Sequence, residues 1–138
     1  MAKIEKLWFD ANRIYLLTDA GETLSRPLEA FPLLKDASEL ERLDFKIGRF
    51  GDDIRWEQLD EDIHLSSFYD VAEPNPDNEV ASIFNQFPQI NVSEMAKYIG
   101  INKSLLAKYI YGIKKPSTKR MQEIKQAFHL MGQQLIAI

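Results

Sequence analysis

Apolar and polar residues alternate along the first part of the chain, which is the pattern of β-strands with one buried face. Residues 4–9 and 14–17 predict two strands, separated by the turn-forming residues Asp10-Ala11-Asn12. Residues 23–26 predict a third strand, which follows a second turn at Asp19-Ala20-Gly21. Short turns between consecutive strands favour an antiparallel sheet.

The period becomes helical over residues 31–43. Pro32 suits the first turn of a helix, and one face would carry Leu33, Leu34, Ala37, Leu40 and Leu43. Alternation returns over residues 44–50, where Phe45, Ile47 and Arg49 share a side, and a turn at Gly51-Asp52-Asp53 follows. Strands and a helix in this order predict a small α+β domain with an antiparallel sheet, and Trp56 is expected to anchor its core.

Two prolines and three turn-forming residues interrupt the chain at residues 73–78. We therefore expect an α+β domain at residues 1–72, a linker at 73–78 and an all-α domain at 79–138. The last of these has a helical period, which predicts helices at residues 80–87, 91–99, 102–111 and 117–130. Residues 134–138 fit either a helix end or a short strand.

Residues 91–111 have the spacing of two helices that meet at a steep angle. Asn91 can cap the first helix, and Glu94 can complete a capping box. Ala96 is small where the helices would cross, and Gly100 can adopt the left-handed conformation that ends a helix. A second cap at Asn102 would start the next helix. The inward positions would be Met95, Ile99, Leu106, Tyr109 and Ile110.

The pattern in this segment is Met95-Ala96, Gly100-Ile101, Ser104 and Leu106, followed by the turn Gly112-Ile113-Lys114-Lys115-Pro116-Ser117. It resembles the XRE-like, phage-repressor type of helix-turn-helix, where Leu-Ala-x-x-x-Gly-Ile-x-x-Ser-x-Leu precedes a Gly-Lys-x-Pro-Ser turn. The resemblance covers roughly residues 90–131. It implies a helix-turn-helix domain whose second helix enters the major groove of DNA.

The resemblance also implies a set of DNA contacts. On the second helix, the residues nearest the base edges would be Lys103, Ser104, Ala107 and Lys108, with Tyr111 on the same exposed face. After it, phosphates would meet Lys114, Lys115 and Lys119, and Ser117 would cap a helix whose positive end favours an anion. The alternative is that the lysines form an ordinary solvated helix face. Tyr98 and Tyr109 are expected to pack in the core instead of stacking on bases.

Charge divides the chain in the same place as the linker. The 138 residues have a net charge of −4. Residues 1–78 contain 9 Lys and Arg against 18 Asp and Glu, a balance of −9, whereas residues 79–138 contain 8 against 3, a balance of +5. The basic part has the sign needed to approach phosphates, and the acidic part would be repelled by them.

A Trp-x-x-Leu-Asp-x-Asp stretch closes the first domain at Trp56, Leu59, Asp60 and Asp62. With the strand-rich start, it resembles the family known as domain of unknown function 2442 over roughly residues 3–70. The resemblance implies a small α+β unit that is sometimes followed by a helix-turn-helix and is associated with toxin–antitoxin-like operons. It supplies no chemistry.

Catalytic and metal chemistry find little support in the sequence. Cysteine is absent, and His64 and His129 are the two histidines, with no metal-ligand spacing around them. Asp60, Glu61 and Asp62 suggest a cation site if they share a strand face, but we expect an acidic surface loop. We therefore expect no enzyme activity, no catalytic residues, no metal and no cofactor.

No apolar run is long enough for a signal peptide or a membrane span, so we expect a cytoplasmic protein without membrane contact. The sequence predicts a transcriptional regulator that binds double-stranded DNA as a homodimer, because two recognition helices must reach successive major grooves. The alternative is an antitoxin-like module whose acidic N-terminal domain binds a basic protein partner. An enzyme that uses a metal at Asp60 and Asp62 is a third hypothesis.

Overall fold

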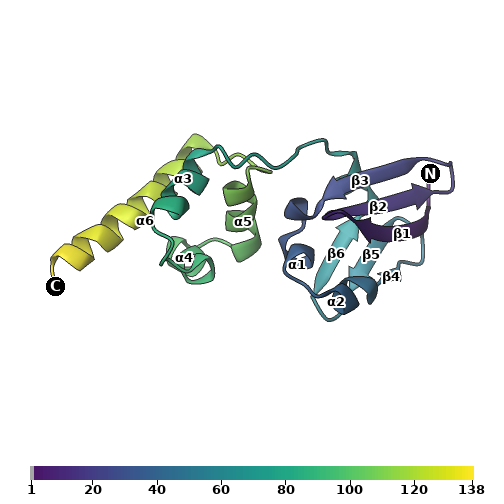
Figure 1. The fold of residues 1–138 in the computed structure, drawn as a ribbon, viewed down its shortest axis with the longest axis horizontal. Coiled ribbons are helices and arrows are strands. Elements are labelled where there is room, and N and C mark those ends of the chain that lie inside the picture. The colour runs from purple at the N-terminus through teal and green to yellow at the C-terminus, as the bar shows by residue number, and fades with distance from the viewer. Residues whose placement is uncertain (1) are drawn as a thin grey trace. The chain divides into compact units, whose positions relative to one another are not determined.

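A computed structural model describes residues 2–138, and the chain divides after Pro74 into two compact units (Figure 1). We call the part up to Pro74 the sheet unit and the part Asn75–Ile138 the helical unit. The sheet unit combines strands with short helices, and the helical unit is built from α3 to α6. The protein therefore has the α+β fold that the sequence predicts.

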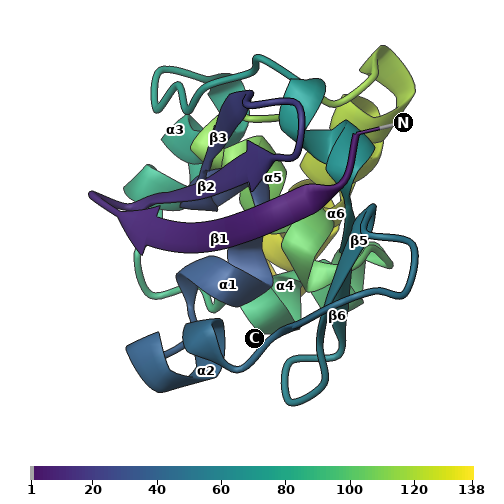
Figure 2. The same cartoon turned by 90° about the vertical axis from the view of Figure 1, so that its right-hand side faces the viewer.

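Two antiparallel sheets form the sheet unit (Figure 2). The first has the order β1 (Ile4–Asp10), β2 (Arg13–Thr18), β3 (Thr23–Pro27). The second has the order β4 (Lys46–Ile47), β5 (Asp53–Trp56), β6 (Glu61–His64), and the short helix η2 (Leu65–Tyr69) follows it. Ala11 and Asn12 form the β1–β2 turn with φ values of 48° and 66°, the conformation that suits the twist of a hairpin. The three strands predicted before residue 28 are confirmed.

The buried faces of β2 and β5 contribute to the core of the sheet unit. Ile14 and Leu16 of β2 have no solvent exposure, and neither do Ile54 and Trp56 of β5. Trp56 Nε1 donates a hydrogen bond of 2.8 Å to the carbonyl oxygen of Arg42, so the one polar atom of the indole is satisfied inside the core. Trp56 is thus the anchor that the sequence predicts.

The single helix predicted over residues 31–43 is wrong. The chain forms two short helices there instead, α1 (Pro32–Lys35) and α2 (Glu39–Leu43), and a one-turn helix, η1 (Leu28–Ala30), precedes them. Ser38 starts α2 with a capping box, because its hydroxyl accepts from the N–H of Glu41 and the Glu41 carboxylate accepts from the N–H of Ser38. Because the helix is interrupted between Lys35 and Glu39, the leucines of α2 do not share a buried face with those of α1. Leu40 and Leu43 are 82% and 61% exposed.

Two further expectations fail between residues 44 and 64. The strand predicted over residues 44–50 is reduced to the two residues of β4, because the chain turns back at Gly48, whose N–H donates to the carbonyl oxygen of Asp53. The residues after Asp60, expected in a surface loop, form β6. This strand pairs with β5 and is held there by Ile63, which is buried in the core.

The helical unit consists of α3 (Glu79–Gln86), α4 (Val92–Ile99), α5 (Lys103–Tyr111) and α6 (Thr118–Ile136). All four lie where the helical period predicts them, and residues 134–136 continue α6 as a helix. One apolar core joins the four helices, built from Val80, Phe84, Met95, Ala96, Leu106, Tyr109 and Ile124.

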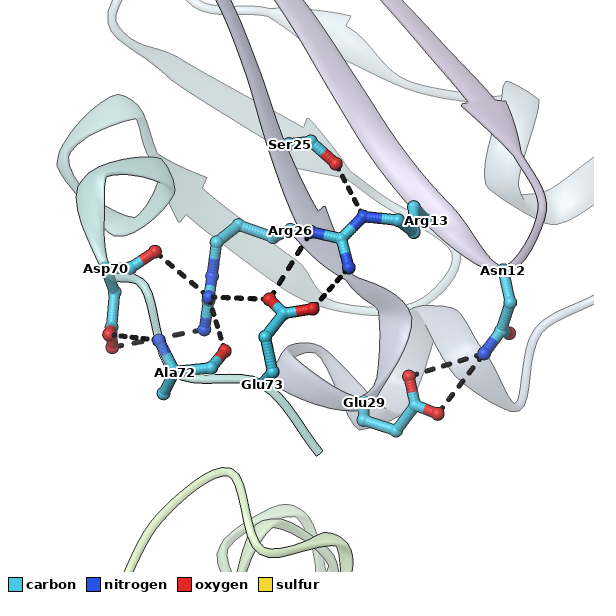
Figure 3. Close-up of polar contacts among 8 residues, drawn as sticks. All are labelled: Asn12, Arg13, Ser25, Arg26, Glu29, Asp70, Ala72 and Glu73. Carbon is cyan, nitrogen blue, oxygen red and sulfur yellow. Dashed lines mark hydrogen bonds and ion pairs between the residues drawn. The ribbon is translucent and has the colours of Figure 1, made fainter. Parts of the chain in front are cut away.

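The segment that leaves the sheet unit is bound to it by two arginines (Figure 3). The side chain of Arg26 is 2% exposed, and its Nη1 donates to the carbonyl oxygens of Asp70 and Ala72 at 3.0 and 2.7 Å. Arg13 pairs with Glu73 at 2.6 Å, and this hydrogen bond raises the pKa of Arg13. The sheet unit therefore fixes its own chain as far as Glu73.

The helical unit fixes the chain from Asn75 onward. The N–H of Asn75 donates to the carbonyl oxygen of Tyr111 at 2.8 Å, and the Asn78 amide donates to the carbonyl oxygen of Ile110 at 3.0 Å. Pro74 is the one residue between the two sets of bonds. The segment expected as a linker at residues 73–78 thus makes ordered contacts, and most of them belong to the helical unit.

Substitutions at two glycines with positive φ can test the close contact between the Asn75 backbone and the end of α5. Gly100 and Gly112 have φ values of 91° and 77°, so alanine is strained at either, by about 1–2 kcal/mol. A Cβ at Gly112 would lie 2.1 Å from the carbonyl oxygen of Asn75, whereas one at Gly100 would meet nothing within 4 Å. We predict that Gly112→Ala lowers the free energy of unfolding clearly more than Gly100→Ala in urea denaturation of the full chain. Equal losses would contradict this close backbone contact.

Candidate nucleic-acid interface

Helices α4 and α5 meet across a turn formed by Gly100, Ile101 and Asn102. Gly100 has the left-handed conformation, and its N–H donates to the carbonyl oxygens of Ala96 and Lys97, which ends α4. The Asn102 side chain accepts a hydrogen bond of 2.7 Å from the N–H of Ser104, which starts α5. The stop and start signals lie two residues apart in sequence, so local bonds limit how α5 can leave α4. We call this arrangement the α4–α5 corner.

The inner side of the α4–α5 corner is packed as the sequence predicts. Ala96 is 1% exposed and Leu106 is 0% exposed, and both belong to the core of the helical unit. Met95 and Tyr109 are buried in the same core, with Ile99 and Ile110 partly buried against it. A larger side chain than alanine at position 96 would push the helices apart.

Two expectations for α4 are wrong in part. The Asn91 side chain accepts from the N–H of Glu94 at 2.9 Å, but the Glu94 carboxylate lies 3.4 Å from Lys97 Nζ and pairs with it instead of completing a capping box. Tyr98 was expected to pack, yet it is 44% exposed, and its hydroxyl donates to Gln134 Oε1 at 3.3 Å. Tyr109 is buried as predicted.

The outer side of α5 carries most of the residues predicted to face DNA. Lys103 is exposed, and Ser104, Lys108 and Tyr111 are half-buried. Ala107 does not lie on an exposed face as predicted, because it is 9% exposed.

The segment after α5 adds a second group of cations. Lys114, Lys115 and Lys119 are exposed. The Ser117 hydroxyl accepts a hydrogen bond of 3.1 Å from the N–H of Arg120, so Ser117 caps α6 as predicted. The first turn of α6 has no acidic residue, so nothing in that turn offsets the positive end of the helix dipole.

Five lysines on this surface lack a carboxylate partner within residues 2–138. We call them the interface lysines: Lys103, Lys108, Lys114, Lys115 and Lys119. Other lysines of the helical unit are paired, since Lys97 binds Glu94 and Lys125 binds Glu79. The interface lysines therefore present charge that the chain does not neutralise by direct contact.

A groove of about 680 Å³ runs beside Lys114 and Lys115. The same groove is also lined by Asp77, Asn78 and Glu79, at and just before the start of α3, and the sequence analysis did not single these residues out. Asn78 caps α3 by accepting from the N–H of Ala81 at 2.9 Å. Asn78 is a residue type that favours helix starts and lies two residues before the helix predicted at 80–87, so the sequence held a signal for this cap.

The carboxylates that suggested a cation site are bound to an arginine. Arg55 Nη2 lies 2.8 Å from Asp60 Oδ1, and Arg55 Nη1 lies 2.8 Å from Asp62 Oδ2. The hydrogen bond to Asp60, a second one to Glu57 and the negative charge of Asp62 raise the pKa of Arg55. Within residues 2–138, no group of three or more His, Cys, Asp or Glu side chains could hold a metal ion. The described helices also include none that is long and apolar enough to cross a membrane.

The sheet unit matches a known family, described as protein of unknown function (DUF2442), over residues 4–74. No curated protein matches the chain. A crystal structure of a protein from Nitrosomonas europaea ATCC 19718, named "Putative DNA Binding Protein", is 12% identical and covers 90% of this chain and 84% of that chain, with a TM-score of 0.34. The two structures differ too much at that score for one to inform the other. The family match, in contrast, spans more than half of the chain and includes the Trp56-x-x-Leu59-Asp60 stretch, so the protein belongs to the DUF2442 family.

Proposed function

We propose that this protein binds double-stranded DNA through the α4–α5 corner and acts as a transcriptional regulator with an XRE-like helix-turn-helix. The observation that carries the proposal is the unpaired state of the interface lysines on and just after α5. An ammonium group without a carboxylate partner can bind a phosphate and release the counterions around it, which is the main source of affinity for DNA.

The interface lysines divide into two roles. Lys103 and Lys108, on the outer side of α5, reach base edges in the major groove, where lysine donates to the O6 and N7 atoms of guanine. Lys114, Lys115 and Lys119 hold phosphates beside the Ser117-capped start of α6, and so set the position of α5 on the duplex.

The charge balance supports a DNA contact through the helical unit. Residues 75–138 contain 8 Lys and Arg against 4 Asp and Glu, a balance of +4, whereas residues 1–74 contain 9 against 17, a balance of −8. Polyanionic DNA repels the sheet unit, which keeps that surface available for other contacts. Specific binding to a two-fold symmetric site would need two copies of the chain.

Replacing Lys103 and Lys108 together with alanine should weaken DNA binding by about 30-fold or more, because each lost contact costs about 1–3 kcal/mol. The duplex is first selected from a random-sequence pool with the wild-type chain, and affinity is measured by fluorescence anisotropy at several salt concentrations. The plot of log association constant against log salt concentration has a negative slope. This slope should become shallower by about 1 for each contact that was made to phosphate, and by less for each contact to a base.

The matched control replaces Lys46 and Lys97 with alanine. This double substitution changes the net charge by the same amount as the first one. Lys46 lies in β4, and Lys97 is already paired with Glu94. The control should bind within a few-fold of the wild type. Equal losses in the two double variants would show that affinity reflects net charge alone, and would refute α5 as the recognition helix.

A second candidate function is antitoxin-like binding of a basic protein by the sheet unit. Exposed Leu40 and Leu43 on α2 favour it, because they lie next to the exposed acidic residues Glu39 and Asp44. Apolar side chains framed by negative charge fit a partner that carries apolar residues on a positive surface.

Replacing Leu40 and Leu43 together with serine should remove most capture of a cationic partner from lysate of the source cell by the immobilised full chain. Affinity for the selected duplex should not change, because α2 lies in the other unit. Retention of the same cationic protein by the variant would rule out this surface, and failure of the wild type to retain one would rule out the function.

A further inference from the structure

An apolar groove of about 690 Å³ lies between α3 and α6. Its apolar lining comes from Ile83, Phe87, Ile90, Phe128, Met131 and Leu135. Figure 1 shows that the C-terminal half of α6 extends beyond the other helices of the helical unit. Leu135 and Ile136 are 61% and 87% exposed there. We call the groove together with Ile136 the α6 face.

The C-terminal half of α6 has no charged residue. Residues 126–138 contain no Asp, Glu, Lys or Arg, although such residues make up 28% of the chain. Surfaces that face water usually carry charge, whereas the centres of protein–protein interfaces are depleted in it. At the rim of the groove, Lys125 and Glu79 pair with each other and leave little net charge. The α6 face is therefore suited to an apolar, uncharged partner surface.

Gly132 lines the groove, and its lack of a side chain leaves room for a second polypeptide backbone to come close. Glycine is less favourable inside a helix than any residue except proline. A Cβ at Gly132 would meet nothing within 4 Å, so the packing of this chain does not require glycine there. A residue without a side chain in an otherwise apolar surface lets a second helix approach closely.

We propose that two copies of this chain dimerise through the α6 face, with the two α6 helices antiparallel and crossing at Gly132. The α6 face supplies both a groove and projecting side chains, Leu135 and Ile136, so it is complementary to itself about a two-fold axis. Its low charge neither repels a second copy nor offers a strongly basic or acidic partner anything to pair with. The proposal does not depend on DNA binding.

The size of the α6 face predicts a reversible dimer. Twelve residues line the groove, fewer than the 20 to 30 residues per side of a standard interface. We expect a dissociation constant on the order of 10 µM. Sedimentation equilibrium of the full chain from about 1 to 300 µM should show the mass rising from 16.0 kDa toward twice that value.

Two leucines of α6 provide a matched pair of variants. Leu135 lines the groove, whereas Leu130 is 49% exposed and lies outside it. Leu135→Lys should weaken the dimer by about 30-fold or more, because it places two ammonium groups in an apolar contact. Leu130→Lys, with the same change of charge on the same helix, should leave the dissociation constant within a few-fold of the wild type.

Gly132 separates an effect on dimerisation from an effect on folding. Gly132→Leu should weaken the dimer by about 30-fold or more without lowering the urea midpoint of the monomer, since leucine favours helix and the space beside it is open. A wild type that stays monomeric over the whole concentration range would overturn the proposal. Equal weakening by Leu130→Lys and Leu135→Lys would also overturn it, because the α6 face would then not be the contact.

Discussion

The burial of Leu106 is the constraint on which the proposed recognition surface depends. Leu106 is 0% exposed, and it shares one core with Ala96 of α4 and Ile124 of α6, which are 1% and 0% exposed. Because this core holds the inner side of α5, the rotation of α5 about its own axis is set. Lys103 and Lys108 then lie on the outer side of α5. The packing of Leu106 thus determines where on the helical unit their charge is presented.

The chain separates opposite charges into two units, and each unit holds its own end of the connecting segment. Arg13 and Arg26 hold the sheet unit's chain up to Glu73, and Asn75 already belongs to the helical unit. Within the helical unit, cations gather around α5 and the start of α6, whereas the far half of α6 is uncharged and apolar. One small helical unit can therefore offer a polar surface for DNA and an apolar surface for a second copy without the two overlapping.

Local signals made the helical unit predictable. Asn91, Asn102 and Ser117 each cap a helix where the sequence indicates one, and Gly100 ends α4, because caps act through bonds to residues two to four positions away. The sheet unit was harder. Ser38 and Glu41 have the spacing of a capping box, which the prediction of one helix over residues 31–43 did not use. The charged residues of β6 concealed its one core residue, Ile63.

The sequence predicted the helix that carries the candidate site, but it did not predict which of the lysines are paired with carboxylates. The sequence places lysines on α5, but whether a lysine is paired depends on side-chain geometry, as the partners of Lys97 and Lys125 show. Ala107 was also misplaced, because the helical period put it on the exposed face whereas it is 9% exposed. Nothing in the sequence marks Arg26 as buried, because the carbonyl groups that bind it lie 44 and 46 residues away.

Hydrogen exchange of the full chain, with and without a duplex selected from a random pool, tests the account most directly. The account predicts slower amide exchange in α5 and at the start of α6 when the duplex is bound, with β1 to β6 unchanged. Protection confined to the sheet unit, or failure of the pool to yield any enriched duplex, would contradict it.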